Sequence, residues 1–493
     1  MPACGGLRNC ALSTCCRVPI HAGESRCAAS VAAIERPSGV FAHEDFDRLN
    51  PKARTDVVPA LRIIPREQHI ISRKNISKAA LRVLYRLNEA GYDAFLVGGA
   101  VRDLLLGGKP KDFDVATNAT PDEVKKLFRN CRLIGRRFRL AHVVFGPEII
   151  EVATFRGTGE EEGNDGERRI VDGRIVRDNV WGTIEEDAVR RDFRVNAMYY
   201  DISDFSVRDY VGGMQDLEDR VLRLIGDPAT RYREDPVRML RAARLAAKLG
   251  FRIDATAAKP FAELGGLLAE AAPARLFDES LKMFLAGNGL KSFRMLEKCG
   301  LLEFMFPATA RALQRGDEAL RALVEQGLAN TDERVAEGKS VTPAFLFAVL
   351  LWGEVRDQAH AWIEQGKDNT EAWARAALHV VGEQCQRVAI PRRFTFTMEE
   401  IWSLQPRFEQ IQRKKVFRLL THPRFRAAFD FLLLRANESA AMRELGQWWA
   451  HAQQLPHETL AAALPNHGGA AVDAEITKVP PRRRRRRRKP SGK

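Results

Sequence analysis

The sequence predicts an α+β fold in which a mixed-sheet head precedes a long all-helical part. Short apolar runs typical of strands alternate with amphipathic helical patterns as far as about residue 224. After Pro236 the strand signal fades, and stretches rich in Leu, Ala and Arg recur at helical spacing to about residue 463. Because 493 residues exceed what one hydrophobic core normally serves, we expect several packed modules.

The head begins with a helix that Ser77 can cap and Gly91 can end. Residues 157–178 are rich in Gly, Glu, Asp and Arg and poor in apolar anchors, which predicts a mobile loop. The other elements predicted for the head are a helix over residues 121–128 and strands over residues 94–97, 112–116, 141–145 and 149–155.

The formal net charge is +14, and residues 482–489 carry more than half of it. A positive excess indicates a polyanionic partner such as nucleic acid, because binding to phosphates releases condensed counterions.

No apolar run approaches the roughly 18–20 residues that a membrane span needs, so we expect no membrane association. Most of the eight cysteines crowd the first 27 residues without disulfide or zinc spacing, and the chain suits a reducing cytoplasm.

The segment from Leu96 to Asn118 is typical of phosphate-handling sites: a strand, a glycine pair, a short helix and a strand with two carboxylates. Gly98 and Gly99 leave room for backbone amides to approach a triphosphate, and the N-terminus of the helix adds partial positive charge. Arg102, one turn into that helix, can reach the same anion.

Asp112 and Asp114 are separated by one residue on a predicted strand, so both carboxylates should point to one face of the sheet. Such hard oxygen ligands suit Mg²⁺, or Mn²⁺ in its place, together with substrate phosphates. Two ions roughly 3.5–4 Å apart would support in-line nucleotidyl transfer. An isolated pair of this kind is usually only solvated, and the preceding glycine pair makes the signal stronger.

This combination resembles the class of nucleotidyltransferases that contains the bacterial poly(A) polymerases and the CCA-adding enzymes. The resemblance covers about residues 64–435 and implies a catalytic head followed by helical neck, body and tail modules. In a second motif, residues 185–201, it implies that Asp192 is an essential acidic residue near the ribose and that Arg191 contacts the nucleotide. Glu151 is a candidate for a further metal-site carboxylate, which the sequence leaves open.

A third motif covers residues 231–251, where Asp235 can cap a helix. The resemblance implies that this helix reads the base of the incoming ATP. Asp235 would accept a hydrogen bond from the adenine amine, and an arginine would donate to the adjacent ring nitrogen. Cytosine offers the same donor and acceptor, so the motif does not separate ATP from CTP. The basic residues of the helix recur at every third position: Arg238, Arg241 and Arg244.

Residues 133–143 look like the stretch that marks poly(A) polymerases within this class, and no His-Asp pair suggests an appended phosphohydrolase domain. We therefore expect a polynucleotide adenylyltransferase that transfers AMP from ATP to RNA 3′ hydroxyls and releases pyrophosphate, in RNA processing and decay. Two alternatives remain open. One is a CCA-adding tRNA nucleotidyltransferase, and the other is a catalytically inactive RNA-binding protein.

The expected organisation is a disordered extension (residues 1–60), the catalytic head (61–225), a neck that binds nucleotide and RNA (226–285), a body with an RNA-binding C-terminal domain (286–463) and a disordered tail (464–493). Residues 391–429 interleave basic and aromatic side chains, which favours RNA contact. The partners are RNA 3′ ends of mRNA, regulatory RNA and fragments, and RNA-decay machinery or an RNA chaperone is conceivable. The tail residues expected to capture RNA are Arg482, Arg483, Arg484, Arg485, Arg486, Arg487, Arg488 and Lys489.

Overall fold

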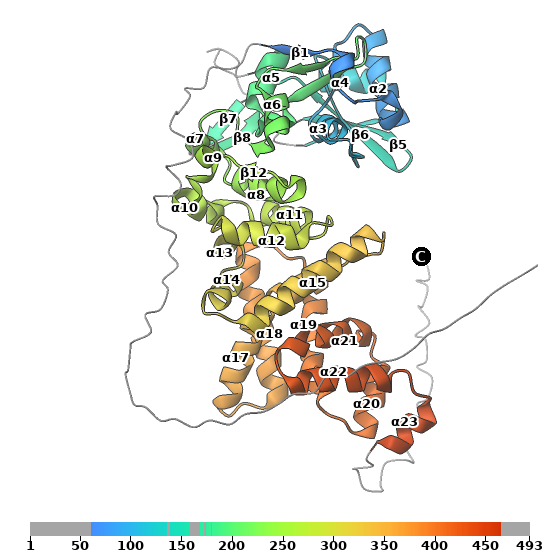
Figure 1. The fold of residues 1–493 in the computed structure, drawn as a ribbon, viewed down its shortest axis with the longest axis vertical. Coiled ribbons are helices and arrows are strands. Elements are labelled where there is room, and N and C mark those ends of the chain that lie inside the picture. The colour runs from blue at the N-terminus through green and yellow to red at the C-terminus, as the bar shows by residue number, and fades with distance from the viewer. Residues whose placement is uncertain (1–60, 136–138, 158–167, 172–173, 179, 465–493) are drawn as a thin grey trace, which may run out of the picture. The chain divides into compact units, whose positions relative to one another are not determined.

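The computed structural model describes residues 61–135, 139–157, 168–171, 174–178 and 180–464. The predicted N-terminal extension and nearly all of the tail, including its basic block, lie outside the described residues. The described residues belong to one compact unit. Figure 1 shows that its strands come mainly from the N-terminal part of the chain and that helices make up the remainder.

Eight strands form one mixed sheet in the order β1-β10-β9-β2-β3-β6-β5-β4. Neighbouring strands pair antiparallel except β3 and β6, which pair parallel. The predicted α+β class with a mixed sheet is confirmed. The strands are β1 (Arg62–Ile64), β2 (Ala94–Val97), β3 (Asp114–Thr117), β4 (Cys131–Ile134), β5 (Leu140–Phe145), β6 (Glu148–Thr154), β9 (Met198–Asp201) and β10 (Val207–Asp209).

The first helix of the head follows its sequence signals. The hydroxyl of Ser77 accepts a hydrogen bond from the Ala80 amide at 3.0 Å, and Gly91 supplies the left-handed turn after the helix with φ +84°. Val83, Leu84 and Leu87 are fully buried on the face that packs against the sheet. The head helices are α2 (Lys78–Glu89), α3 (Gly99–Leu105), α4 (Pro121–Leu127), α5 (Ile184–Arg190) and α6 (Gly213–Asp219).

Two expectations for the head are wrong. The strand predicted from residue 112 begins only at Asp114, because its partner β2 ends at Val97 and Gly98 then turns the chain away. The predicted loop over residues 157–178 contains a hairpin, β7 (Arg168–Val171) and β8 (Arg174–Asp178). Its strands are rich in β-branched residues, which favour extended pairing.

The second half is helical apart from one short parallel pair, β11 (Val221–Leu222) with β12 (Arg252–Ile253). A strand after Pro236 was not predicted. The helices, omitting 3₁₀ turns, are α7 (Pro228–Glu234), α8 (Val237–Leu249), α9 (Ala255–Ala258), α10 (Phe261–Leu264), α11 (Pro273–Phe284), α12 (Gly289–Lys298), α13 (Leu302–Met305), α14 (Pro307–Gln314), α15 (Glu318–Ala336), α16 (Pro343–Leu350), α17 (Trp352–Glu364), α18 (Asn369–Arg387), α19 (Arg392–Phe408), α20 (Arg413–Leu420), α21 (Phe425–Leu434), α22 (Ala440–Ala452) and α23 (His457–Ala463).

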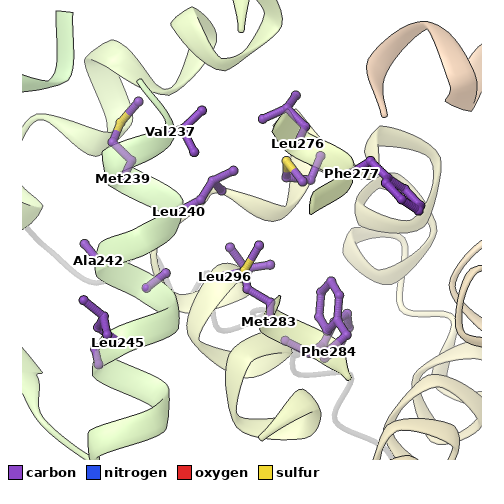
Figure 2. Close-up of a cluster of buried hydrophobic side chains, with 14 of the residues drawn as sticks. Val237, Met239, Leu240, Ala242, Leu245, Leu276, Phe277, Met283, Phe284 and Leu296 are labelled. Carbon is purple, nitrogen blue, oxygen red and sulfur yellow. The ribbon is translucent and has the colours of Figure 1, made fainter. Parts of the chain in front are cut away.

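One hydrophobic cluster continues from the sheet into the helical half, and a second occupies the helices from α19 to α23. Figure 2 shows Leu240 of α8, Met283 of α11 and Leu296 of α12 pointing toward one another within the first cluster. This shared core fixes α8 against the helices that follow it. The predicted domain boundaries at residues 225 and 285 stay predictions, since the core does not stop at either.

Candidate active site

Two acidic residues of the site lie on the neighbouring strands β3 and β6. Asp114 is the first residue of β3, and the parallel register places it opposite Glu151 of β6. On its other side Asp114 pairs with Val97, the last residue of β2. Asp112 is exposed and precedes the strand, whereas Phe113 is buried. The structure therefore brings Glu151 beside Asp114.

The carboxylate of Asp114 has an unfavourable electrostatic environment. Burial raises the pKa of Asp114 to about 6, with further contributions from Glu151 and Asp112 and opposition from Arg191. His142 Nε2 lies 3.4 Å from Glu151 Oε2. In the part of the chain that the structure describes, no group of three or more His, Cys, Asp or Glu is arranged to hold a metal ion. Mg²⁺ is usually held by only one or two carboxylates together with substrate phosphates.

Gly98 keeps open the space in front of Asp114. Its φ of 77° and ψ of −139° form a conformation that side chains disfavour, and it directly precedes Gly99 at the start of α3. A Cβ atom added to Gly98 would lie 3.7 Å from Asp114 Oδ2 and 3.8 Å from Arg191 Nη1. The glycine thus leaves a small cradle between a carboxylate and a guanidinium.

Arg102 was expected to reach the triphosphate, but its side chain does not line the cavity in front of Asp114. It is only 3% exposed, and its Nε and Nη2 donate to Asp103 Oδ1 at 2.8 and 2.6 Å. Its Nη1 donates to Asn196. The guanidinium lies beside Gly99, and each of its nitrogens donates a hydrogen bond to Asp103 or Asn196. Arg102 is therefore a buried structural residue.

Arg191 follows the C-terminus of α5 and is held by two buried partners. Its Nη2 donates to Asp187 Oδ2 at 2.8 Å, and its Nε lies 3.0 Å from the Tyr199 hydroxyl. Burial alone would raise the pKa of Asp187, but Arg191 and the hydrogen bond from Tyr199 hold it below the ordinary value. Asp187 is therefore an ionised anchor for this guanidinium.

Asp192 faces the basic stripe of α8. Its Oδ1 accepts a hydrogen bond from Arg238 Nε at 2.8 Å, and its Oδ2 forms an ion pair with Arg241 Nη1 at 2.8 Å. Burial would raise the pKa of Asp192, but Arg241 and Arg238 outweigh it and lower that pKa. The third residue of the stripe, Arg244, pairs instead with Glu279.

Asp235 was expected to cap α8, and this expectation is wrong. The residue that precedes α8 is Pro236, and no side chain caps that end. The carboxylate of Asp235 instead accepts two hydrogen bonds from Arg275 Nη1 and Nη2, at 2.9 and 2.8 Å. A bidentate guanidinium partner is stronger than a cap, which explains where the side chain points.

A cavity of about 310 Å³ collects most of these groups. Its lining includes the predicted residues Asp114, Arg191, Asp192, Asp235, Arg238 and Arg241, together with Glu151. Gly98, Gly99, Arg102 and Asp112 are not part of the lining. Sequence reasoning assigned no role to five further charged residues of the lining: Arg156, Asp187, Arg190, Arg231 and Arg275.

Some of these five residues carried a signal in the sequence. Asp187 lies four residues before Arg191 on a predicted helix, a spacing that brings the two side chains together. Arg231 begins the third motif, and its Nη2 donates to the backbone carbonyls of Arg190 and Arg191 at 2.7 and 2.9 Å. Arg275 belongs to none of the three motifs, and only the fold brings it to Asp235.

The aromatic side chains of residues 391–429 are mostly core. Trp402, Phe408, Phe425 and Phe429 are buried and cannot stack on RNA bases, whereas Phe396 is 57% exposed. Most aromatics of this segment are therefore packing residues, and contact of the segment with RNA stays a prediction. Phe408, Phe425 and Phe429 pack in the second hydrophobic cluster, and Trp402 packs in the first.

The fold of this chain is shared with known RNA-modifying enzymes. The crystal structure of the Bacillus stearothermophilus CCA-adding enzyme in complex with CTP superposes with a TM-score of 0.51 at 24% identity, covering 77% of this chain and 82% of that one. This likeness shows the nucleotidyltransferase fold. Three family profiles also match: the poly A polymerase head domain at residues 94–223, the probable RNA and SrmB-binding site of polymerase A at 250–313, and the polymerase A arginine-rich C-terminus at 365–490.

Poly(A) polymerase I of Salmonella typhi is 53% identical over 430 residues, which are 86% of this chain and 91% of that protein. The CCA-adding enzyme of Lactobacillus johnsonii is 36% identical over 225 residues, only 46% of this chain. The chain therefore belongs to the bacterial poly(A) polymerase family. This confirms the prediction of a poly(A) polymerase over that of a CCA-adding enzyme. Within the described ranges, no helix combines the length and apolarity needed to cross a membrane.

Because burial places the folded-state pKa of Asp114 near 6, above its ordinary value of 3.8, protonated Asp114 contributes stability below about pH 4. That contribution is lost as the pH rises through 6. In metal-free protein, Asp114→Asn should raise the free energy of unfolding by about 2 kcal/mol at pH 7.5 and leave it unchanged near pH 4. Denaturant unfolding in EDTA at both pH values measures this. Asp112→Asn, at an exposed position, should have a smaller effect, and equal effects of the two variants would contradict the assignment.

Proposed function

We propose that this chain transfers AMP from ATP to the 3′ hydroxyl of RNA without a template. The 3′ oxygen forms a bond to the α-phosphorus while the bond to pyrophosphate breaks. One observation carries the proposal: a single cavity holds both the paired carboxylates, Asp114 and Glu151, and the base-reading side chains, Asp235 and Arg238. We place the reaction in the cytoplasm, where it would tail mRNA, regulatory RNA and RNA fragments for processing or decay.

The carboxylates fit Mg²⁺, or Mn²⁺ in its place. Their donors are hard oxygens. Burial and the negative charge of Glu151 raise the pKa of Asp114, and a divalent cation bound there would offset both effects. Asp112 and Asp114 would hold the ions, with Glu151 as a further ligand. When bound, such ions supply the Lewis acidity that activates the 3′ hydroxyl and stabilises the leaving pyrophosphate.

The chain itself would bind the triphosphate and orient it. Gly98 and Gly99 leave the backbone accessible, and Arg191 offers a guanidinium beside the cradle. Arg102, which is buried, supports Gly99 and Asn196 rather than touching the nucleotide. Asp192 would act near the ribose by fixing Arg238 and Arg241.

Base selection would rest on Asp235 and Arg238. Among the described residues, Arg238 Nη2 has no hydrogen-bond partner, so it can donate to a ring nitrogen. Asp235, held in place by Arg275, can accept from the exocyclic amine of adenine. This pattern excludes G and U, and membership of the poly(A) polymerase family favours ATP over CTP.

Replacing Asp114 tests the chemistry directly. Asp112→Ala or Asp114→Ala should abolish AMP addition to a short RNA while RNA binding largely survives, because the carboxylates serve the metal and not the RNA. Asp122→Ala, at an exposed acid of the same head, is the matched control and should stay active. Incorporation by the Asp114→Ala variant at the unmodified rate would remove the two-metal proposal, and the catalytically inactive RNA-binding alternative predicts no incorporation by any form.

Supplying one nucleotide at a time distinguishes a poly(A) polymerase from a CCA-adding enzyme. With ATP alone the chain should add many adenylates to an unstructured RNA, and with CTP alone it should add none. A CCA-adding enzyme would incorporate CTP before ATP on truncated tRNA. Repeated CTP incorporation at the ATP rate would overturn the base-selection proposal.

The basic block at residues 482–489 should capture RNA without specificity and raise its encounter rate. Removing the block should weaken RNA affinity and make the dependence of log K on log salt shallower by about 0.7 for each lost phosphate contact. The rate of adding a single nucleotide at saturating RNA should stay near normal. Unchanged RNA binding would contradict the proposed role. RNA-decay machinery or an RNA chaperone would be a further partner.

A further inference from the structure

The guanidinium of Arg191 is anchored on one side and free on the other. Asp187 Oδ2 accepts from its Nε and Nη2 at 3.2 and 2.8 Å, and the Tyr199 hydroxyl lies 3.0 Å from Nε. The same hydroxyl donates to Asp187 Oδ2 at 2.7 Å. No hydrogen bond to Arg191 Nη1 is found in the described part of the chain.

The free nitrogen faces the cradle in front of the catalytic carboxylate. A Cβ atom added to Gly98 would lie 3.8 Å from Arg191 Nη1 and 3.7 Å from Asp114 Oδ2. The nitrogen and the carboxylate therefore border the same small space. A phosphate bound by ions on Asp114 would lie within reach of this donor.

The anchor is rigid because its two members come from different elements of the head. Tyr199 is on β9 in the sheet and fully buried, and its ring contacts Phe95, Phe155 and Tyr210 edge-on at centroid distances of 6.2, 6.5 and 5.9 Å. Asp187 is on α5 and 7% exposed. A guanidinium held in this way loses little conformational freedom when it binds an anion.

We infer that Asp187 and Tyr199 are positioning residues that hold Arg191 so that its Nη1 meets the triphosphate of the incoming nucleotide. This rests on the proposed function and assigns roles to two residues that the motifs did not single out for chemistry. The triphosphate is the expected ligand because Nη1 lies beside Asp114, where the ions that bind the phosphates are proposed to sit.

Tyr199→Phe tests the inference, since it keeps the packed ring and removes only the hydroxyl. The KM for ATP and the inhibition constant of pyrophosphate should both rise about tenfold, the loss expected for one hydrogen bond to a charged group. The kcat and the KM for RNA should change little, because a contact made equally in the ground and transition states affects KM alone. Tyr210→Phe, in the same aromatic cluster but without contact to Arg191, should behave as the unmodified chain.

A double-mutant cycle separates positioning from packing. If Tyr199 acts through Arg191, Tyr199→Phe should cause little further loss in an Arg191→Lys background. An equal loss in both backgrounds, an unchanged KM for ATP, or a lower melting temperature with no change in KM would each overturn the inference. Failure of the unmodified chain to incorporate AMP would overturn the proposed function and this inference together. Normal incorporation with an unaffected Tyr199→Phe variant would overturn the inference alone.

Discussion

The parallel pairing of β3 with β6 is the constraint on which the site depends. It places Asp114 opposite Glu151 across two central strands, where burial raises the free energy of the charged form of Asp114. Strongly perturbed carboxyl groups of this kind cluster at functional sites. Guanidinium groups line the rest of the cavity, and we propose that the carboxylates bind divalent cations.

Arginines from the helical half bind the segment of the head that carries Arg191 and Asp192. Arg231 donates to two backbone carbonyls of that segment, and Arg238 and Arg241 share the carboxylate of Asp192. The groups that we propose to bind phosphate and to read the base are thereby joined by partly buried, charge-assisted contacts. In the proposed function, these contacts would couple selection of the base to alignment of the triphosphate.

Local patterns in the sequence were enough for most elements and for the residues within single motifs. The caps of α2, the strand β2 and the basic stripe of α8 all depend on neighbours a few positions apart. The sequence also carries a hairpin signal that the loop expectation overlooked, an Asp-Gly dipeptide between the pairs Ile170–Val171 and Ile175–Val176.

Contacts between distant segments could not be predicted from local sequence patterns. The partnership of Asp114 with Glu151 requires the register of two strands, and that of Asp235 with Arg275 requires the packing of α11. The exact start of β3 likewise follows from where β2 ends.

The most direct measurement of the central claim is a crystal structure with Mn²⁺ and a nonhydrolysable ATP analogue. Anomalous signal beside Asp114, with the adenine between Asp235 and Arg238, is the predicted result. Ions and analogue bound elsewhere, with this cavity vacant, would contradict it.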